Sequence, residues 1–159
     1  YLTIVDGIIG GDGDGPMSCD PVASGVILAG THPVAVDCVS AQLMGLNWKK
    51  TRLLNDAFEV KRLPIVGFAP SEIKVASNKA EWSGPFEQMK DCFEFQCHFG
   101  WSGHLESDER LARMGNQSST TVRPKARGRL RRPPSTRWTS MRRRYLPRVW
   151  PRRAWARVR

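Results

Sequence analysis

Short apolar runs alternate with a helical pattern in the first 45 residues. Leu2–Val5 is rich in β-branched residues and ends at an Asp-Gly pair, which predicts a strand followed by a turn. Gly25–Ala29 is continuously apolar, which predicts a second strand covered on both faces of its sheet. Val34–Met44 begins after Pro33 and ends at Gly45, so this segment is predicted to be a helix.

The pattern continues more weakly through residue 106. Residues 49–60 predict a second helix with an inner face of Leu53, Leu54, Ala57 and Phe58, and the alternation of Glu72–Ala76 predicts an edge strand. Residues 78–106 predict irregular structure that is aromatic enough to pack back on the domain. Together these elements predict an α/β fold over residues 1–106, a layered sheet with flanking helices. Because the chain opens in a strand-like segment at Tyr1, we expect the fold to be incomplete at its N-terminus.

The composition changes abruptly after this domain. All 15 acidic residues lie in residues 1–109, whereas 17 of the 25 basic residues lie in residues 110–159. Residues 107–159 therefore predict a disordered, Arg-rich, low-complexity tail. Its arginines and tryptophans would suit a nucleic-acid-binding arm. We favour another interpretation, out-of-frame translation of GC-rich DNA, because the tail has neither acids nor apolar periodicity, and we therefore do not expect nucleic acid as a partner.

Several classes of protein are disfavoured by the sequence. The four cysteines are few and scattered, so we expect reduced thiols in the cytoplasm and no disulfide scaffold. No closely spaced cysteine run is present, so no iron–sulfur cluster is expected in this chain. Cys92 and Cys97-His98 lack the second pair that a zinc site needs. No run of about 18 apolar residues occurs, so a membrane-spanning helix is not expected.

The acidic, glycine-rich segment from Asp6 to Pro16 is the main candidate for chemistry, and we expect it to be a loop. It lacks the glycine spacing of a dinucleotide-binding motif and the Gly-Lys-Ser/Thr of a P-loop, and it does not fit a calcium loop. Two interpretations stay open. Asp6, Asp12 and Asp14 could hold a divalent cation or a cation-bridged phosphate. Alternatively, these aspartates cap the backbone of an ordinary turn.

Asp37 is a second candidate. At 100° per residue it shares a narrow polar strip with Ser40 on an otherwise apolar helix. A buried carboxylate needs backbone donors, a cation or a basic side chain as a partner. A structural role and a role in a site are both consistent with this position.

A series of motifs in a fixed order resembles the C-terminal part of the family called domain of unknown function 362. The motifs are the acidic segment Asp6–Pro16, Gly25–Gly30, Pro33–Asp37, Leu43–Gly45 and Gly100–Glu106. The resemblance covers residues 1–106 and leaves out the family's N-terminal half. The loop's usual Glu-like position is filled by Asp12, and the tail matches nothing in the family.

This resemblance implies a redox-associated role, because members of the family are joined to ferredoxin-type iron–sulfur modules or resemble their partners. It implies Gly13, Gly15 and Asp37 as cofactor-binding positions and the loop carboxylates as metal ligands. The sequence therefore predicts a ligand-binding domain that takes a small anionic ligand, with a divalent cation as cofactor and a ferredoxin-type protein as partner. A truncated fragment without function, and nucleic-acid binding through the tail, are the alternatives.

Overall fold

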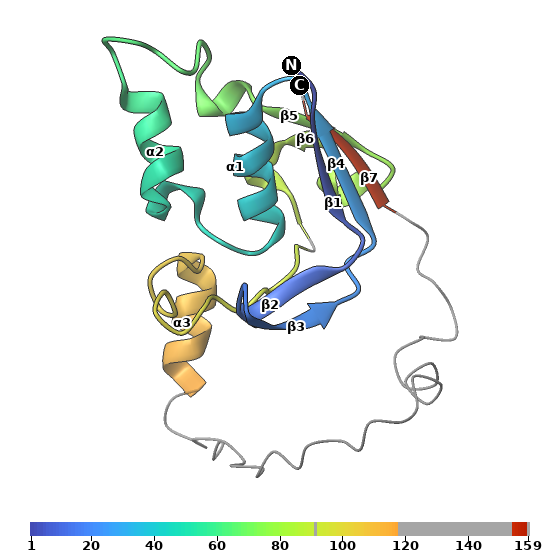
Figure 1. Cartoon of the computed structure of the whole chain (residues 1–159), viewed down its shortest axis with the longest axis vertical. Coiled ribbons are helices and arrows are strands. Elements are labelled where there is room, and N and C mark those ends of the chain that lie inside the picture. The colour runs from blue at the N-terminus through green and yellow to red at the C-terminus, as the bar shows by residue number, and fades with distance from the viewer. Residues whose placement is uncertain (91, 118–153, 159) are drawn as a thin grey trace.

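The computed structural model describes residues 1–90, 92–117 and 154–158. These residues form a five-stranded sheet of order β1-β4-β7-β5-β6, a separate β2–β3 hairpin and three α-helices (Figure 1). The predicted α/β fold class is therefore confirmed. The predicted disordered tail spans residues 107–159, of which residues 118–153 and 159 lie outside the described residues.

The five-stranded sheet joins segments that are far apart in the chain. Its strands are β1 (Thr3–Gly7), β4 (Val26–Gly30), β7 (Ala154–Val158), β5 (Lys74–Ser77) and β6 (Gly84–Pro85). β4 pairs antiparallel with β1 and parallel with β7, and β5 pairs antiparallel with both β7 and β6. The prediction of an edge strand near Glu72–Ala76 is wrong, because β5 has a neighbour on each side.

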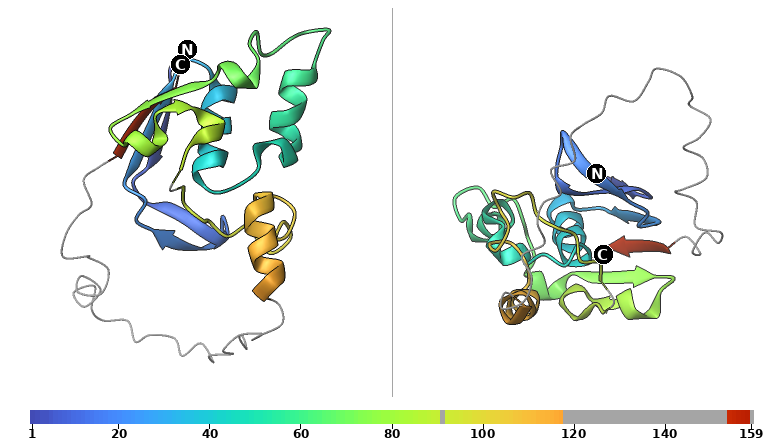
Figure 2. Two further views of the ribbon diagram at one scale, coloured as in Figure 1. Left: turned by 180° about the vertical axis from the view of Figure 1, so that it is seen from behind. Right: turned by 90° about the horizontal axis from the view of Figure 1, so that it is seen from below.

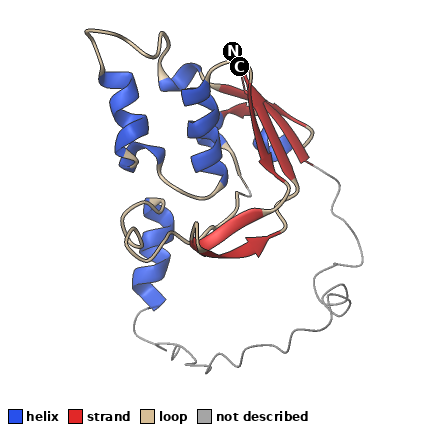
Figure 3. Ribbon diagram, viewed as in Figure 1, coloured by secondary structure: helices blue, strands red, loops and turns tan. Residues whose placement is uncertain are grey.

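The helices lie on one side of this sheet (Figure 3). Val26 and Leu28 point to that side and are buried, whereas Ile27 between them is 40% exposed. The prediction that this strand is covered on both faces is therefore wrong. Alternate residues of a strand point to opposite faces, and among the described residues no helix covers the second face.

Helix α1 (Pro33–Leu43) is the main cover of the sheet. Pro33 occupies the first turn and His32 is the N-cap, with no side-chain cap hydrogen bond. The helix ends before Gly45, whose φ of 75° is the left-handed conformation that glycine adopts readily. Its predicted start and stop signals are confirmed, and its apolar face is buried: Ala35, Val36, Cys38, Val39, Ala41 and Leu43.

The second predicted helix is divided in two. A 3-10 turn, η1 (Trp48–Lys50), precedes helix α2 (Arg52–Glu59), and Thr51 between them is extended. α2 packs against α1 on the side away from the sheet (Figure 2). The predicted inner face is correct for Leu54, which is buried, but wrong for Leu53, which is 80% exposed.

The region between α2 and residue 106 contains three short 3-10 turns, η2 (Pro70–Glu72), η3 (Ala80–Trp82) and η4 (Phe86–Gln88). Trp82 and Phe86 are 0% and 1% exposed and belong to the central core. Residues 92–98 have no regular secondary structure. The prediction of irregular structure with aromatic packing is confirmed here.

Two segments differ from what the sequence predicted. The glycine-rich segment is not only a loop, because β2 (Gly10–Asp14) forms an antiparallel hairpin with β3 (Ser18–Val22). Within the expected tail, residues Asp108–Gln117 form helix α3 and Ala154–Val158 form β7. Among the described residues, each helix is too short or too polar to cross a membrane.

Gly45 offers a test of this packing. Replacing it with alanine should lower the free energy of unfolding by about 2 kcal/mol or more, because a left-handed conformation costs an L-residue about 1–2 kcal/mol and the new Cβ would overlap the carbonyl oxygen of Phe93. Urea denaturation measures the change. Gly67→Ala is the control, because a Cβ at Gly67 has no neighbour within 4 Å. Equal effects of the two substitutions would contradict this account.

Candidate functional site

The β2–β3 hairpin carries two of the three predicted metal ligands, Asp12 and Asp14, on one face. Asp12 and Asp14 are two residues apart on β2, so their side chains point to the same side. Asp20 on β3 is the direct partner of Asp12 in the antiparallel register. Three carboxylates therefore share one face of a short hairpin, and like charges directly opposite each other destabilise a pair of strands.

This face contacts the backbone of the late segment 96–99. The Oδ1 atom of Asp12 accepts a hydrogen bond from the amide of Gln96, and the Oδ1 atom of Asp14 accepts one from the amide of Phe99 at 3.3 Å. Gly10 permits the close approach, since a Cβ there would lie 2.7 Å from the ring of Phe95. The hairpin and the late segment therefore form one unit.

Asp6 lies apart from the other two aspartates, at the end of β1. Its Oδ1 atom accepts a hydrogen bond of 3.0 Å from the amide of Ile8, as expected for an aspartate that caps its own turn. For Asp6 the structure thus matches the ordinary-turn interpretation. Among the described residues, no three His, Cys, Asp or Glu side chains are grouped so that they could hold a metal ion, and the assignment of metal ligands stays a prediction.

The two glycines predicted to bind a cofactor use their amides within the chain. The Gly13 amide donates to the carbonyl of Gln96 at 3.1 Å, and the Gly15 amide donates to the carbonyl of Gly13 at 2.7 Å. Any ligand at this loop would therefore rely on other groups than these two amides.

Asp37 is on the exposed side of α1, about two helical turns before the end of the helix. Partial burial raises the pKa of its carboxyl above the usual value. The hairpin instead lies near the C-terminal end of α1, because the amide of Phe95, next to Gln96, donates to the carbonyl of Met44. The structure does not bring Asp37 to the hairpin, and its cofactor role stays a prediction.

Glu106 is a buried acidic residue near the hairpin that was not predicted as a site residue, although it closes the last motif, Gly100–Glu106. It is 1% exposed, and its Oε2 atom accepts a hydrogen bond of 2.9 Å from the amide of Gly103. Burial alone would raise the pKa of Glu106. Three hydrogen bonds, from its own amide, the Gly103 amide and the Cys97 thiol, together with the positive charge of Arg110, outweigh this effect, and the pKa of Glu106 is lowered. This carboxylate is therefore charged at neutral pH and accepts hydrogen bonds from its own chain.

None of the four cysteines, all of which lie in the described residues, forms a disulfide bond. Cys97 is partly buried, and burial together with the neighbouring Glu106 raises its pKa. Cys38 is fully buried in α1, and burial raises its pKa to about 12. Both thiols are protonated at neutral pH and are therefore poor nucleophiles.

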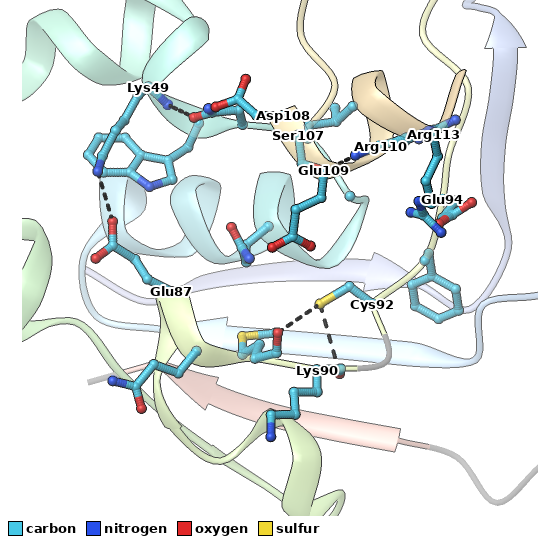
Figure 4. A pocket seen from close by; sticks show the side chains of 18 residues that line it. Lys49, Glu87, Lys90, Cys92, Glu94, Ser107, Asp108, Glu109, Arg110 and Arg113 are labelled. Atoms are coloured by element: carbon cyan, nitrogen blue, oxygen red, sulfur yellow. Dashed lines mark hydrogen bonds and ion pairs between the residues drawn. The ribbon is translucent and has the colours of Figure 1, made fainter. Parts of the chain in front are cut away.

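Two clefts meet at α3. The larger, of about 710 Å³, lies between η1, the segment 87–94 and the start of α3 (Figure 4). Four basic and four acidic side chains line it: Lys49, Lys90, Arg110, Arg113, Glu87, Glu94, Asp108 and Glu109. Lys49 and Glu87 form an ion pair of 3.3 Å across its mouth.

The smaller cleft, of about 360 Å³, is beside the hairpin. Gln96, Cys97, Glu106 and the two arginines of α3 line it. Arg110 is 9% exposed and donates from Nη1 to the carbonyl of Phe95 at 2.6 Å. Arg113 pairs with Glu94, and both side chains stay more than half exposed. This cleft therefore contains the accessible guanidinium of Arg113, and it adjoins the hairpin through Gln96, whose amide donates to Asp12.

A comparison with protein families identifies the first part of this arrangement. Residues 1–42, from β1 to within α1, match the family described as Domain of unknown function (DUF362). Over these residues the chain is similar to the DUF362 family. The predicted resemblance is thus confirmed over residues 1–42, which include the hairpin and Asp37. No curated protein and no solved structure matches the chain.

The DUF362 match ends before the segment that the hairpin contacts, so the resemblance of residues 43–106 stays a prediction. Within the matched part lie all the residues that the sequence singled out, namely Asp6, Asp12, Gly13, Asp14, Gly15 and Asp37. Gln96 and Phe99, which bind the hairpin, and the neighbouring Glu106 and Arg110 lie beyond it. Sequence reasoning missed these residues because backbone amides and a single buried acid have no local signature.

Glu106→Gln tests the electrostatics around the DUF362 hairpin. At pH 7 this variant should lose about 1–3 kcal/mol of unfolding free energy, because a charged, buried hydrogen-bond acceptor is replaced by a neutral one. The folded pKa lies below the ordinary value of 4.5. The contribution of the carboxylate is therefore complete above the unfolded pKa and is lost as the pH falls through the folded one.

The difference between parent and Glu106→Gln should accordingly narrow on acidification. Urea denaturation at pH 7 and in steps below about pH 4.5 measures it. The exposed Glu81 supplies the control substitution Glu81→Gln. A difference between parent and Glu106→Gln that stays constant with pH would contradict the charged state assigned to Glu106.

Proposed function

We propose that this chain is a ligand-binding domain that takes a small anionic ligand with the help of a divalent cation. The observation that carries the proposal is the acidic face of the hairpin, where Asp12 stands opposite Asp20 with Asp14 beside it. A cation would relieve the repulsion between these carboxylates. The match of residues 1–42 to DUF362, a family of unknown function, does not specify a ligand.

The chemistry of the donors favours a hard cation. Asp12 and Asp14 each use Oδ1 for a backbone amide, so Oδ2 is the atom of each carboxylate that would face the ion. Magnesium is commonly held by only one or two carboxylates together with oxygens of a bound phosphate and water. Such a site does not need three protein ligands, which agrees with the absence of a three-residue cluster among the described residues.

The ligand itself would lie in the smaller cleft beside the hairpin. Arg113 at this cleft is accessible, and a guanidinium binds phosphate or carboxylate through paired hydrogen bonds. Its ion pair with Glu94 would open when the ligand binds. A cation on the hairpin and a guanidinium on α3 would thus hold one anion from two sides.

The redox part of the proposal, with a ferredoxin-type iron–sulfur protein as partner, rests only on the resemblance to the family. The geometry supports the binding of an anion and a cation and adds no electron carrier to it. We therefore place ligand binding first and the redox association second.

Isothermal titration calorimetry of the full chain with Mg²⁺, Mn²⁺ and Ca²⁺ tests the cation. The double variant Asp12→Asn/Asp14→Asn should bind at least about tenfold more weakly, which corresponds to about 1.4 kcal/mol. Asn keeps an oxygen for each backbone amide, so the hairpin should stay docked. Asp56→Asn on α2 is the matched control and should bind like the parent. Equal heats for parent and double variant would refute the cation site.

Inorganic phosphate serves as the probe for the anion. Phosphate should bind more tightly in the presence of Mg²⁺ than in its absence, and Arg113→Gln should weaken phosphate binding while Mg²⁺ binding is unchanged. Phosphate affinity that depends neither on Mg²⁺ nor on Arg113 would refute the cleft as the anion site.

A further inference from the structure

The strand β7 completes the middle of the sheet although it comes from a remote part of the chain. Its residues Ala154–Val158 pair with Val26–Gly30 of β4 on one side and with Val75–Ser77 of β5 on the other. The right-hand view of Figure 2 shows β7, in red, between these two neighbours. Without it, β4 and β5 would each present an unpaired strand edge toward the same gap.

The space that β7 fills between β4 and β5 accepts only small side chains on the face that packs against α1. Ala156 and Val158 are 2% and 3% exposed and belong to the central core. A Cβ placed on Gly30 would lie 2.6 Å from Val36 and 3.0 Å from Val158, so this end of the gap is tightly filled. Arg157 between them is exposed on the other face. An occupant therefore needs small or β-branched residues at alternating positions.

The two walls of the gap are held by elements other than β7. β4 pairs with β1 and packs against α1, and β5 pairs with β6 and contacts η3. The chain enters β7 only after residues 118–153, which at about 3.3–3.6 Å per residue can span more than about 100 Å. Such a connection lets the same strand reach the gap of its own chain or that of a neighbour.

We propose that the gap between β4 and β5 is a strand-acceptor site and that β7 is an exchangeable strand that a second copy of this chain can supply. The main-chain hydrogen bonds to both neighbours provide affinity, and the alternating small residues provide specificity, as in other cases of strand addition. The β7 strand of a second copy can occupy this gap, because it has the same sequence as the strand that the gap already holds.

Disulfide trapping between folded full-length chains tests this exchange. Ala29 and Arg157 are register partners in adjacent strands, on the face away from α1. One population carries Ala29→Cys and the other Arg157→Cys, both with Cys19→Ser to remove an exposed thiol. After mixing and oxidation, a disulfide-linked heterodimer forms when β7 of one chain lies in the gap of the other.

Ile4→Cys mixed with Arg157→Cys is the matched control. Ile4 pairs with Ala29, so it lies on the same exposed face but two strand spacings, about 10 Å, from Arg157. This separation exceeds the reach of a disulfide. The register pair should yield at least about fivefold more heterodimer than the control pair, and equal yields would overturn the proposal.

A peptide spanning residues 152–159 serves as a competitor in the same mixture. In excess, it should suppress the heterodimer of the register pair by occupying the gap. A peptide of the same charge with Ala156→Pro should not, because proline cannot donate to a ladder and is excluded from a central strand. Equal suppression by both peptides would show an effect of charge alone and would overturn the strand-acceptor site.

Discussion

The backbone of residues 93–99 holds the separate parts of this structure together. The amides of Phe93 and Phe95 donate to the carbonyls of Leu43 and Met44, which end α1. On its other side the segment binds the hairpin, through Asp12 and Asp14, and it accepts a hydrogen bond from Arg110 of α3. A segment without secondary structure of its own thus satisfies its polar groups by joining three elements, as buried backbone groups must.

This arrangement gives the hairpin aspartates two roles that act on each other. Each carboxylate already accepts an amide hydrogen bond, which restricts its position before any ion arrives. Such restriction lowers the entropy that binding would otherwise cost. The same hydrogen bonds draw electron density from the two carboxylates. A bound ion would therefore share each carboxylate with a backbone amide. The position of residues 96–99 and the strength of a cation site are therefore linked.

The sequence predicted the elements whose signals are local. β1, β4 and α1 have apolar runs bounded by glycine and proline, and the structure contains each of them. The hairpin was missed because the five glycines from Gly7 to Gly15 are typical of a loop. The strand β2 depends on its pairing with β3, which the local sequence of β2 does not indicate. In α2 the residues that pack inward are Leu54 and Ala57, and Leu53 is 80% exposed, because the apolar positions alone do not determine how the helix is rotated against α1.

The site could be predicted only in part for the same reason. Asp6, Asp12 and Asp14 were found by their unusual density of acid and glycine, but the partners of Asp12 and Asp14 come 84 and 85 positions later in the chain. The sequence around Glu106 and Arg110 contains no recognisable motif for a buried charge. Only the fold shows that Glu106 is buried and that Arg110 donates a hydrogen bond to the carbonyl of Phe95. Long-range pairing, not local propensity, determines this part of the molecule.

The central place of β7 has a consequence for the speed of folding. Val26 cannot pair with Ala154 until the chain between them has closed into a loop. The conformational entropy lost in closing this loop is not offset until the hydrogen bonds between β4 and β7 form. Structures with such distant pairings fold slowly. During that interval β4 and β5 expose apolar strand edges, which are templates for aggregation. The yield of soluble protein on refolding should therefore fall as the protein concentration rises.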